Sequence, residues 1–469
     1  MSFEADSIFG ALKNRIKSGK KLAKKGSRNG FFHILGGNTL VKVVSALSVL
    51  LFPRIMGDSY GTFKLADDFL SYLLIANGLG MTNVILRYCS AFDTPQEQKS
   101  YFNFAIKFGI ISDIALLLVY GLLLYLPELF GIYIVRFGAD KILGLMLFSL
   151  FLDFLFNSMQ NFLRTNRENK KYARSSVIFS LSYALIPCIL AAVFSAFGLT
   201  MQGAVLGRYI AYVIVLIIIF KTIRSIPAFK EKPLKLSRTE KVGAIKYALN
   251  TLIANAFSLM MPYNESIVLS MMVSKLLYND FKVAQLVPAS IQFISSSVVV
   301  FIYPYFAKNY TDGKWIFKNT KKVILGISAA MGIISLVGII FSPQIVLVFG
   351  SRFKTDNAIR LMRVFFITFA INSAVRLPVG NILAAIGEVR FNIANAIFSS
   401  TVHIGICWAM TYSFGINGAA YGLLIGYIIS SVAAVIYLRY YCNKLERRKS
   451  NSIVSLDGED IEADEKEVQ

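Results

Sequence analysis

Twelve apolar stretches, each long enough for a helix to cross about 30 Å of hydrocarbon, constrain this chain more than any other feature. Charged residues form 16% of the sequence, whereas soluble globular proteins carry about 25%. The stretches lie near residues 31–53, 62–86, 102–126, 140–163, 172–197, 200–221, 243–272, 281–306, 320–341, 357–386, 391–414 and 417–440. The sequence therefore predicts an all-α integral membrane protein with twelve transmembrane helices.

Short sequence matches recur at nearly the same spacing and indicate an internal duplication. Residues 60–66 (Tyr-Gly-Thr-Phe-Lys-Leu-Ala) match residues 278–284 (Tyr-Asn-Asp-Phe-Lys-Val-Ala) at an offset of 218. Further matches follow in the same order at offsets of 215–220. Six helices in each half is an even number, so both halves insert with the same orientation. We expect two parallel six-helix repeats, related by a pseudo-twofold axis along the membrane normal.

Lysine and arginine are concentrated in alternate connections, which predicts the side of the membrane that each connection faces. The N-terminal stretch and the 4–5, 6–7 and 8–9 connections are rich in them, whereas the 5–6 and 11–12 connections have none. Basic connections face the cytoplasm, so both termini are expected there. Five parts follow: a basic amphipathic N-terminus (1–30), an N-terminal bundle (31–221), a cytoplasmic linker (222–242), a C-terminal bundle (243–440) and a disordered acidic tail (441–469).

The net charge of +22 is explained by these connections, so it does not indicate a nucleic-acid partner. The four cysteines are scattered and form no CxxC pair, and we expect His33 and His403 to be packing residues. The sequence has no P-loop, no Gly-x-Ser-x-Gly and no His-Glu-x-x-His. We therefore expect no enzymatic activity, no metal and no cofactor.

Polar residues inside the apolar segments form the candidate site, because burying a charge in a bilayer is costly. In segment 31–53 they share one helical face. In segment 62–86 they gather at its beginning, again on a common face. The two sets are Asn38, Lys42, Ser45 and Ser48, and Lys64, Asp67, Asp68 and Ser71.

The equivalent helices of the second half carry matching stripes: Thr251, Asn255, Ser258, Pro262 and Glu265 on segment 243–272, and Lys282, Gln285, Gln292 and Ser296 on segment 281–306. Four stripes on symmetry-related helices predict a shared water-filled cavity, and Asn38, Asn255 and Gln285 are candidate lining residues. Pro262 is the candidate hinge, because proline removes a backbone hydrogen bond and bends a helix. Asp67, Asp68 and Glu265 are candidates for a coupling ion.

Simpler explanations compete for several of these residues. Lys64 and Lys282 lie near helix ends, where a lysine can extend to the interface, and Lys64 is also placed to pair with Asp67. Arg54 is also explained as an interfacial anchor. Lys42 and Glu265 lie well inside their segments, so they are hardest to explain in this way.

Two other sets also have structural explanations. Asp113 and Asp153 lie inside apolar segments and are explained as buried hydrogen-bonding groups. The patterns Gly203-xxx-Gly207 and Gly418-xxx-Gly422-xxx-Gly426 are typical of helix-packing surfaces.

The turn at residues 53–61 (Pro-Arg-Ile-Met-Gly-Asp-Ser-Tyr-Gly) resembles polysaccharide-unit flippases of the O-antigen and capsule type. The following segment, which ends in Gly78-Leu79-Gly80 and Arg87-Tyr88, is also similar to that family, as are the Pro304-Tyr-Phe end of segment 281–306 and the Gly203 and Gly418 turns. The resemblance covers residues 30–440 and implies the multidrug/oligosaccharidyl-lipid/polysaccharide exporter fold.

This resemblance also implies a function. The substrate would be a polyprenyl-diphosphate-linked oligosaccharide, moved from the cytoplasmic to the outer leaflet of a bacterial inner membrane by alternating access. The cavity would bind the diphosphate through Lys42, Arg54, Lys64 and Lys282. Membrane lipids, a polysaccharide polymerase and chain-length proteins are the implied partners.

Other functions remain open. A multidrug/cation antiporter of the same fold would use Glu265 or Asp67 to bind a proton or sodium ion. A major-facilitator transporter also has twelve helices, but the 2–3 connection lacks that family's basic Gly-Asp-Arg signature. A polysaccharide polymerase or ligase needs a large external loop, and every external connection here is short.

Overall fold

The computed structural model describes residues 48–91, 94–128, 135–260 and 263–467, and every regular element in these ranges is a helix. The chain forms two compact units. Unit 1 comprises the described part of Met1–Leu51, together with Asn77–Leu116 and Phe148–Ala248. Unit 2 comprises Phe52–Ala76, Leu117–Leu147 and the described part of Leu249–Gln469. Residues 52–76 and 117–147, which the sequence assigns to the N-terminal bundle, thus cluster with the C-terminal one. The boundaries of the two six-helix bundles stay a prediction.

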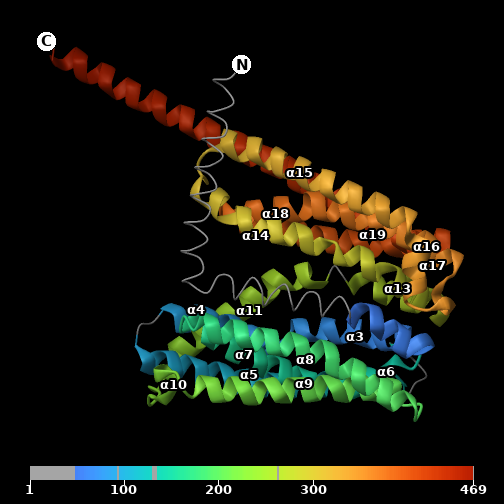
Figure 1. The fold of residues 1–469 in the computed structure, drawn as a ribbon. Helices are drawn as coiled ribbons and strands as arrows, with labels where there is room; N and C mark the ends of the chain where they lie inside the picture. The colour runs from blue at the N-terminus through green and yellow to red at the C-terminus, as the bar shows by residue number, and fades with distance from the viewer. Residues whose placement is uncertain (1–47, 92–93, 129–134, 261–262, 468–469) are drawn as a thin grey trace, which may run out of the picture. The chain divides into compact units, whose positions relative to one another are not determined.

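Unit 1 is built from long apolar helices (Figure 1). They are α4 (Met81–Ala91), most of α5 (Pro95–Glu128), α7 (Ser149–Thr165), α8 (Asn169–Ser195), α9 (Thr200–Ile223), the short α10 (Pro227–Lys230) and the beginning of α11 (Arg238–Met260). Their core contains Phe154, Phe162 and Val215, none of which is exposed. In the linker, Ser237 and Glu240 exchange hydrogen bonds and cap α11, with the Ser237 amide 2.7 Å from Glu240 Oε2.

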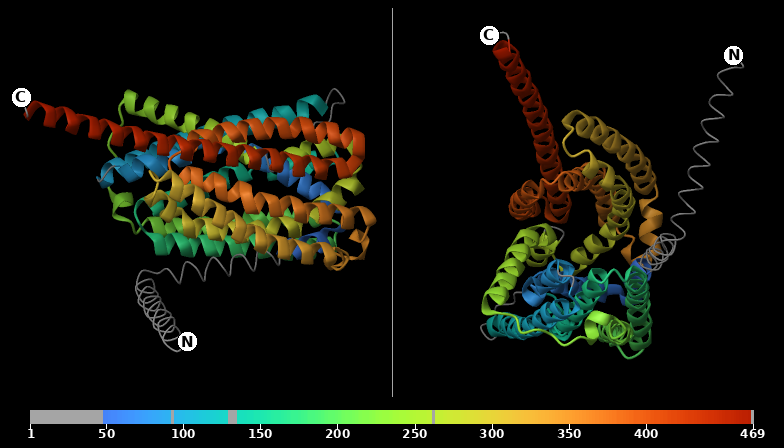
Figure 2. Two further views of the ribbon diagram at one scale, coloured as in Figure 1. Left: turned by 90° about the horizontal axis from the view of Figure 1, so that it is seen from above. Right: turned by 90° about the vertical axis from the view of Figure 1, so that its left-hand side faces the viewer.

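Unit 2 contains the remaining helices, seen from two further sides in Figure 2. They are η1 (Gly57–Ser59), α3 (Tyr60–Ile75), α6 (Ala139–Met146), α12 (Asn264–Met272), α13 (Lys275–Ser290), α14 (Gln292–Lys308), α15 (Gly313–Ile340), α16 (Ser342–Val348), η4 (Ser351–Phe353), α17 (Asp356–Ile371), the π-helix η5 (Asn372–Arg376), α18 (Leu377–Ala385) and α19 (Val389–Glu467). One apolar core joins α14, α15, α18 and α19 through residues such as Phe306, Ile316 and Leu383.

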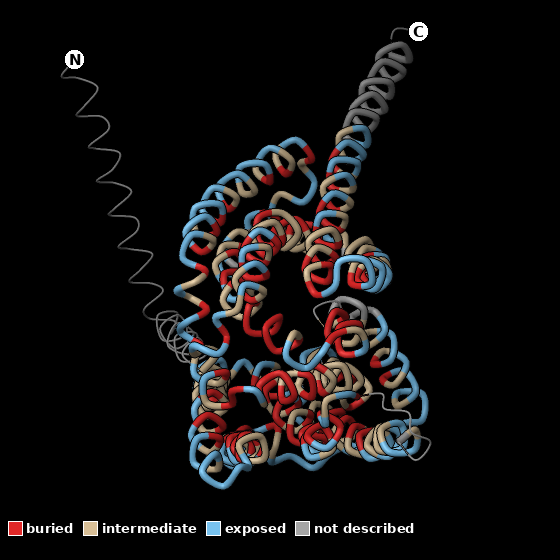
Figure 3. The backbone as a smooth tube through the Cα atoms, turned by 90° about the vertical axis from the view of Figure 1, so that its right-hand side faces the viewer, coloured by how far each residue is buried: buried red, intermediate tan, exposed pale blue. Residues whose placement is uncertain are grey.

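Among the described residues, eight helices are long and apolar enough to span a membrane, or nine if the bent pair α6 and α7 forms one span. Predicted segments 391–414 and 417–440 both lie in α19, which breaks at Gly415 (φ 59°, ψ −144°). Segment 31–53 lies largely outside the described residues, as does the predicted amphipathic helix at 1–30. Apolar side chains such as Ile111, Leu122 and Leu325 are more than half exposed, which suits a surface facing lipid. Figure 3 colours the exposed residues, polar and apolar alike, pale blue along the backbone.

Small residues allow two pairs of helices to approach closely. A Cβ on Gly207 would lie 2.5 Å from the Cα of Pro187, so α8 and α9 are in backbone contact. The two parts of α19 pack in the same way, because Gly418, Gly422 and Gly426 face Met410, Cys407 and His403 in turn. The predicted helix-packing role of both glycine patterns is confirmed.

Predicted segment 62–86 is broken in its middle. The 3₁₀ turn η2 (Asn77–Gly80) separates α3 from α4, and its backbone is left-handed at Gly78 (φ 57°), Leu79 (φ 46°) and Gly80 (φ 79°). A non-glycine residue in this region is strained. The break coincides with the point where the chain passes from unit 2 into unit 1.

The end of the chain differs from its prediction. Helix α19 continues to Glu467, through the acidic segment for which the sequence predicts disorder. Extending an existing helix needs no new nucleus, which is the costly step of helix formation, so an acidic segment can stay helical without burying an apolar face.

We expect Gly418→Ala to lower the thermal stability of the purified protein, because the added Cβ would lie 1.8 Å from the Met410 carbonyl oxygen. Overpacking of this kind costs about 1–3 kcal/mol. Gly405→Ala is the matched control in the same helical pair, since a Cβ there meets nothing within 4 Å. Melting curves in detergent compare the two, and equal stability would contradict the close packing at Gly418.

Candidate functional site

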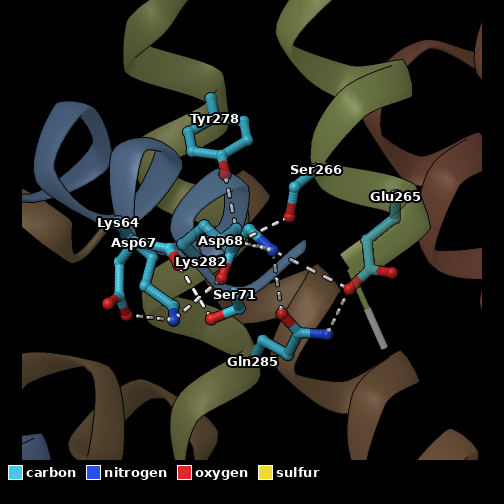
Figure 4. A network of polar contacts seen from close by, with 9 residues as sticks. All are labelled: Lys64, Asp67, Asp68, Ser71, Glu265, Ser266, Tyr278, Lys282 and Gln285. Carbon is cyan, nitrogen blue, oxygen red and sulfur yellow. Dashed lines mark hydrogen bonds and ion pairs between the residues drawn. The ribbon is translucent and has the colours of Figure 1, made fainter. Parts of the chain in front are cut away.

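The polar residues of three helices in unit 2 form one connected network (Figure 4). Helix α3 contributes Lys64, Asp67, Asp68 and Ser71, α12 contributes Glu265 and Ser266, and α13 contributes Tyr278, Lys282 and Gln285. The sequence predicts most of these residues as stripes on separate helices. In the structure the stripes of α3, α12 and α13 meet.

Asp68 is the centre of the network. Its Oδ1 lies 2.9 Å from Lys64 Nζ, and its Oδ2 lies 2.9 Å from Lys282 Nζ. Its Oδ2 also accepts hydrogen bonds from Ser266 Oγ at 2.5 Å and from the Tyr278 hydroxyl at 3.4 Å. Asp68 is only 1% exposed, so these four partners replace the water that an ionised carboxylate loses on burial.

Lys282 connects Asp68 to a second carboxylate. Its Nζ lies 3.7 Å from Glu265 Oε1, and the Gln285 amide nitrogen donates to the same oxygen at 3.0 Å. Glu265 is fully buried, and its other oxygen has no hydrogen-bond partner among the described residues. Lys64 additionally pairs with Asp67 at 3.0 Å. The network thus contains two lysines and three carboxylates.

The pseudo-twofold relation between the repeats is visible in this network. Gly61 and Asn279 are repeat equivalents, and a Cβ on Gly61 would lie 3.1 Å from the Asn279 Cβ. A residue that contacts its own equivalent lies close to a twofold axis. Lys64 and Lys282 are also equivalents, and both pair with the single carboxylate of Asp68. The duplication therefore places two equivalent lysines beside the same carboxylate, that of Asp68.

Two simpler explanations of the lysines are now resolved. Lys282 is 3% exposed and pairs inside the protein, so it does not extend to the interface. The predicted local pair of Lys64 with Asp67 is present, but Lys64 also reaches Asp68.

The sequence does not single out Arg376, which forms a second polar group in unit 2. Arg376 ends the π-helix η5, where its Nε donates to Ser430 Oγ at 3.0 Å and its guanidinium stacks 5.5 Å from the Tyr427 ring centroid. Its Nη1 donates to Asn372 Oδ1 at 3.4 Å. The spacing of Asn372 and Arg376, four apart inside an apolar segment, is the signal that would have found them. π-Helical turns are frequent at functional sites.

His403 is buried as predicted, but neither ring nitrogen has a hydrogen-bond partner among the described residues. The expectation of a satisfied packing histidine is therefore wrong in its hydrogen bonding. Burial lets a neutral imidazole pack as an apolar ring, at the cost of two unpaired nitrogens.

The structure places the other predicted residues as follows. Asn38, Lys42 and Pro262 lie outside the described residues, and so does the side chain of Asn255. The Arg54 side chain is exposed, and its carbonyl oxygen accepts a hydrogen bond from Arg352 at 3.5 Å. No cluster of three His, Cys, Asp or Glu side chains suited to a metal occurs in the described part of the chain.

We expect Asp68→Asn to destabilise the protein more than Asp67→Asn, because it removes the negative charge that buried Lys282 shares with partly exposed Lys64. Leaving a buried charge without its partner costs on the order of 3–5 kcal/mol. The Asp67 side chain is 23% exposed and pairs with Lys64, and because it is more exposed than Asp68 it is the matched control. Adding Lys282→Gln to Asp68→Asn should restore part of the loss. Thermal melting of the three variants beside the unchanged protein checks this, and equal melting points for the two single variants would contradict it.

Comparison with known proteins shows the fold. The sequence matches no family model and no curated protein. An inward-facing multidrug resistance MATE family transporter of the MOP superfamily matches with a TM-score of 0.68 and 14% identity, over 87% of this chain and 95% of that one. The lipid II flippase MurJ in an inward closed conformation matches with a TM-score of 0.70 and 15% identity, over 87% of both chains. The eukaryotic MATE transporter AtDTX14 matches at 0.59 and 13% identity, over 89% of this chain and 99% of that one. The predicted fold class is confirmed: this chain is a multi-pass all-α membrane protein with the two-repeat, twelve-helix fold of these transporters.

Proposed function

We propose that the protein is a flippase that moves a polyprenyl-diphosphate-linked oligosaccharide from the cytoplasmic to the outer leaflet by alternating access. The observation that carries the proposal is the pairing of repeat-equivalent Lys64 and Lys282 with one buried carboxylate, Asp68. The resemblance of the 53–61 turn to polysaccharide-unit flippases supports it. A fold shared with a lipid II flippase is consistent with it.

The chemistry of the network suits an anionic headgroup. Asp68 pairs with both lysines in this conformation, and Asp67 and Glu265 pair with one lysine each, so a diphosphate that replaces Asp68 would meet two positive charges already held in place. Attraction between such charges is strong away from bulk water. Lysine acts as a mobile point charge, which suits a ligand that must also be released. Lys42 and Arg54 would complete the cationic cavity, with Asn38, Asn255 and Gln285 as neutral hydrogen-bonding groups.

A multidrug/cation antiporter is the second candidate. The observation that favours it is the unpaired Oε2 of buried Glu265, an oxygen that a proton or sodium ion would satisfy. In that function Asp67, Asp68 and Glu265 bind the coupling ion and the substrate is a cationic drug. Drug efflux from proteoliposomes, without flipping of the lipid-linked oligosaccharide, would favour this candidate over the flippase.

The proposed flippase works in a bacterial inner membrane, within the synthesis of O-antigen, lipopolysaccharide or capsule. A polymerase and chain-length proteins would use its product. This orientation places residues 222–242 and both termini in the cytoplasm.

We expect Lys232→Cys, in the exposed linker, to resist an impermeant thiol reagent in intact cells and to react after the membrane is permeabilised. The four native cysteines are buried, so they give little background. Labelling in intact cells would overturn the proposed orientation.

We expect Lys282→Gln to reduce flipping at least about tenfold, because a hydrogen bond to a charged group contributes about 1.5–3 kcal/mol. Lys275→Gln, an exposed lysine on the same helix, is the control and should flip at the normal rate. Lys282→Arg should keep much of the activity. Flipping of a fluorescent polyprenyl-diphosphate oligosaccharide in proteoliposomes measures all three.

A second variant separates this role from stability. Lys282→Gln combined with Asp68→Asn removes both members of the buried pair, so it should recover folding but not flipping. Normal flipping by the double variant would show that Lys282 serves only to neutralise Asp68, and the diphosphate role would then be wrong.

A further inference from the structure

The interruption between α3 and α4 holds a second polar cluster, in unit 1. Asp113 on α5 accepts a hydrogen bond from the Gly78 amide, with Oδ1 2.7 Å from the nitrogen. Asn77, the residue before Gly78, donates its side-chain amide to Asp153 Oδ2 on α7 at 2.9 Å. Asp153 also accepts from the Tyr212 hydroxyl at 3.0 Å and from Asn157 at 2.8 Å.

Two oxygens of this cluster lack a hydrogen-bond donor. Asp113 has no exposed surface, yet its Oδ2 has no partner, and the Asn77 Oδ1 is also buried without one. The other polar side-chain atoms of Asp113 and Asn77 form hydrogen bonds within the same cluster. Buried oxygens without donors are rare in folded proteins because each one gives up the hydrogen bonds that water would provide.

The cluster also lacks a compensating positive charge. No lysine or arginine of the described residues forms an ion pair with Asp113 or Asp153. This is the reverse of the α3–α12–α13 network, where lysines neutralise the carboxylates. Asp113 is buried, Asp153 and Asn77 are partly exposed, and the neighbouring polar groups are the amides of Asn77 and of exposed Asn157 and the buried hydroxyl of Tyr212.

We propose that these oxygens bind a small monovalent cation, a sodium ion or a proton. Asp113 and Asn77 supply the two donor-free oxygens, and Asp153 supplies the second negative charge. Hard cations select oxygen ligands of this kind. Coupling-ion sites in transporters are typically built where a membrane helix is interrupted near the middle of the bilayer. Asn77, Asp113 and Asp153 all lie inside their predicted segments, away from the segment ends.

The proposed cation site lies close in sequence to the positions where the chain passes between the two units. The chain passes between the two units at Ala76–Asn77, at Leu116–Leu117 and at Leu147–Phe148, within about one or two helical turns of the three residues. A cation that holds the Asn77–Gly80 turn to α5 and α7 would stabilise one geometry of that turn. Loss of the cation would free a turn in which Leu79 already adopts a strained left-handed conformation.

Other titratable groups near Asp113 bear on the proton case. They are Asp153 on α7 and Tyr212 on α9, and the Tyr183 ring of α8 lies 5.6 Å from that of Tyr212. Arg208 on α9 stacks on Tyr183, with its guanidinium carbon 5.4 Å from the ring centroid. Tyr88 and Tyr101 belong to the same apolar core.

Direct binding to the purified full-length protein tests the proposal, and it does not depend on the identity of the transported substrate. We expect saturable binding of radioactive sodium, weakened on the order of tenfold or more by Asp113→Asn and by Asn77→Ala, because affinity follows ligand charge and number. Asp113→Asn keeps an oxygen that accepts from Gly78, so it preserves the fold. Asp280→Asn is the matched control, since Asp280 is a buried carboxylate of unit 2 that pairs with Thr355.

Infrared difference spectroscopy distinguishes the two cations. If the ligand is a proton, sodium binding is absent, and a protonated-carboxyl band is lost in Asp113→Asn but kept in Asp280→Asn. Sodium binding that Asp113→Asn leaves intact would overturn the proposal. Absence of both sodium binding and the Asp113 carboxyl band, in protein shown by melting to be folded, would also overturn it.

Discussion

A bilayer has no water to solvate a charge, and this constraint organises the polar interior of the protein. Asp68 shows the consequence most clearly, because two lysines, a serine and a tyrosine all contact its carboxylate. Each partner supplies a hydrogen bond or a charge contact that water would supply at a solvent-exposed surface. Pairing these groups therefore constrains how helices α3, α12 and α13 meet.

The two units meet the same constraint in different ways. In the α3–α12–α13 network of unit 2, two lysines pair with three carboxylates, so the network neutralises most of its own charge. In unit 1, Asp113 and Asp153 have neutral hydrogen-bond donors but no ion pair with a described residue. A self-neutralised network suits exchange with a charged substrate, whereas uncompensated oxygens suit a cation. This division is consistent with a transporter that handles substrate and coupling ion at separate places.

Sequence reasoning succeeded where the signal is local. Apolar length predicted the spans, glycine spacing predicted the contacts of α8 with α9, and the repeat predicted that Lys64 and Lys282 are equivalent. It failed where the outcome depends on which helices meet. The polar stripes were expected to line one shared water-filled cavity and not to pair with each other, so the direct contact of Asp68 with Lys282 was not foreseen. The left-handed turn at Asn77–Gly80 and the π-helix ending at Arg376 were missed too, because a hydropathy pattern averages over both.

The duplication explains why the network is asymmetric. Lys64 has carboxylates three and four positions later on its own helix, whereas the repeat places Gln285 and Leu286 after Lys282. The second lysine thus occupies the equivalent position without local counter-ions, and in this structure it pairs with Asp68 of the first repeat and Glu265 of α12. A pair between helices of different repeats exists only while those helices are adjacent. If the proposed alternating access separates them, Lys64 keeps Asp67 as a local partner, but Lys282 loses its closest anion. In the proposed flippase, a buried lysine that loses one anion in this way is well suited to accept a diphosphate.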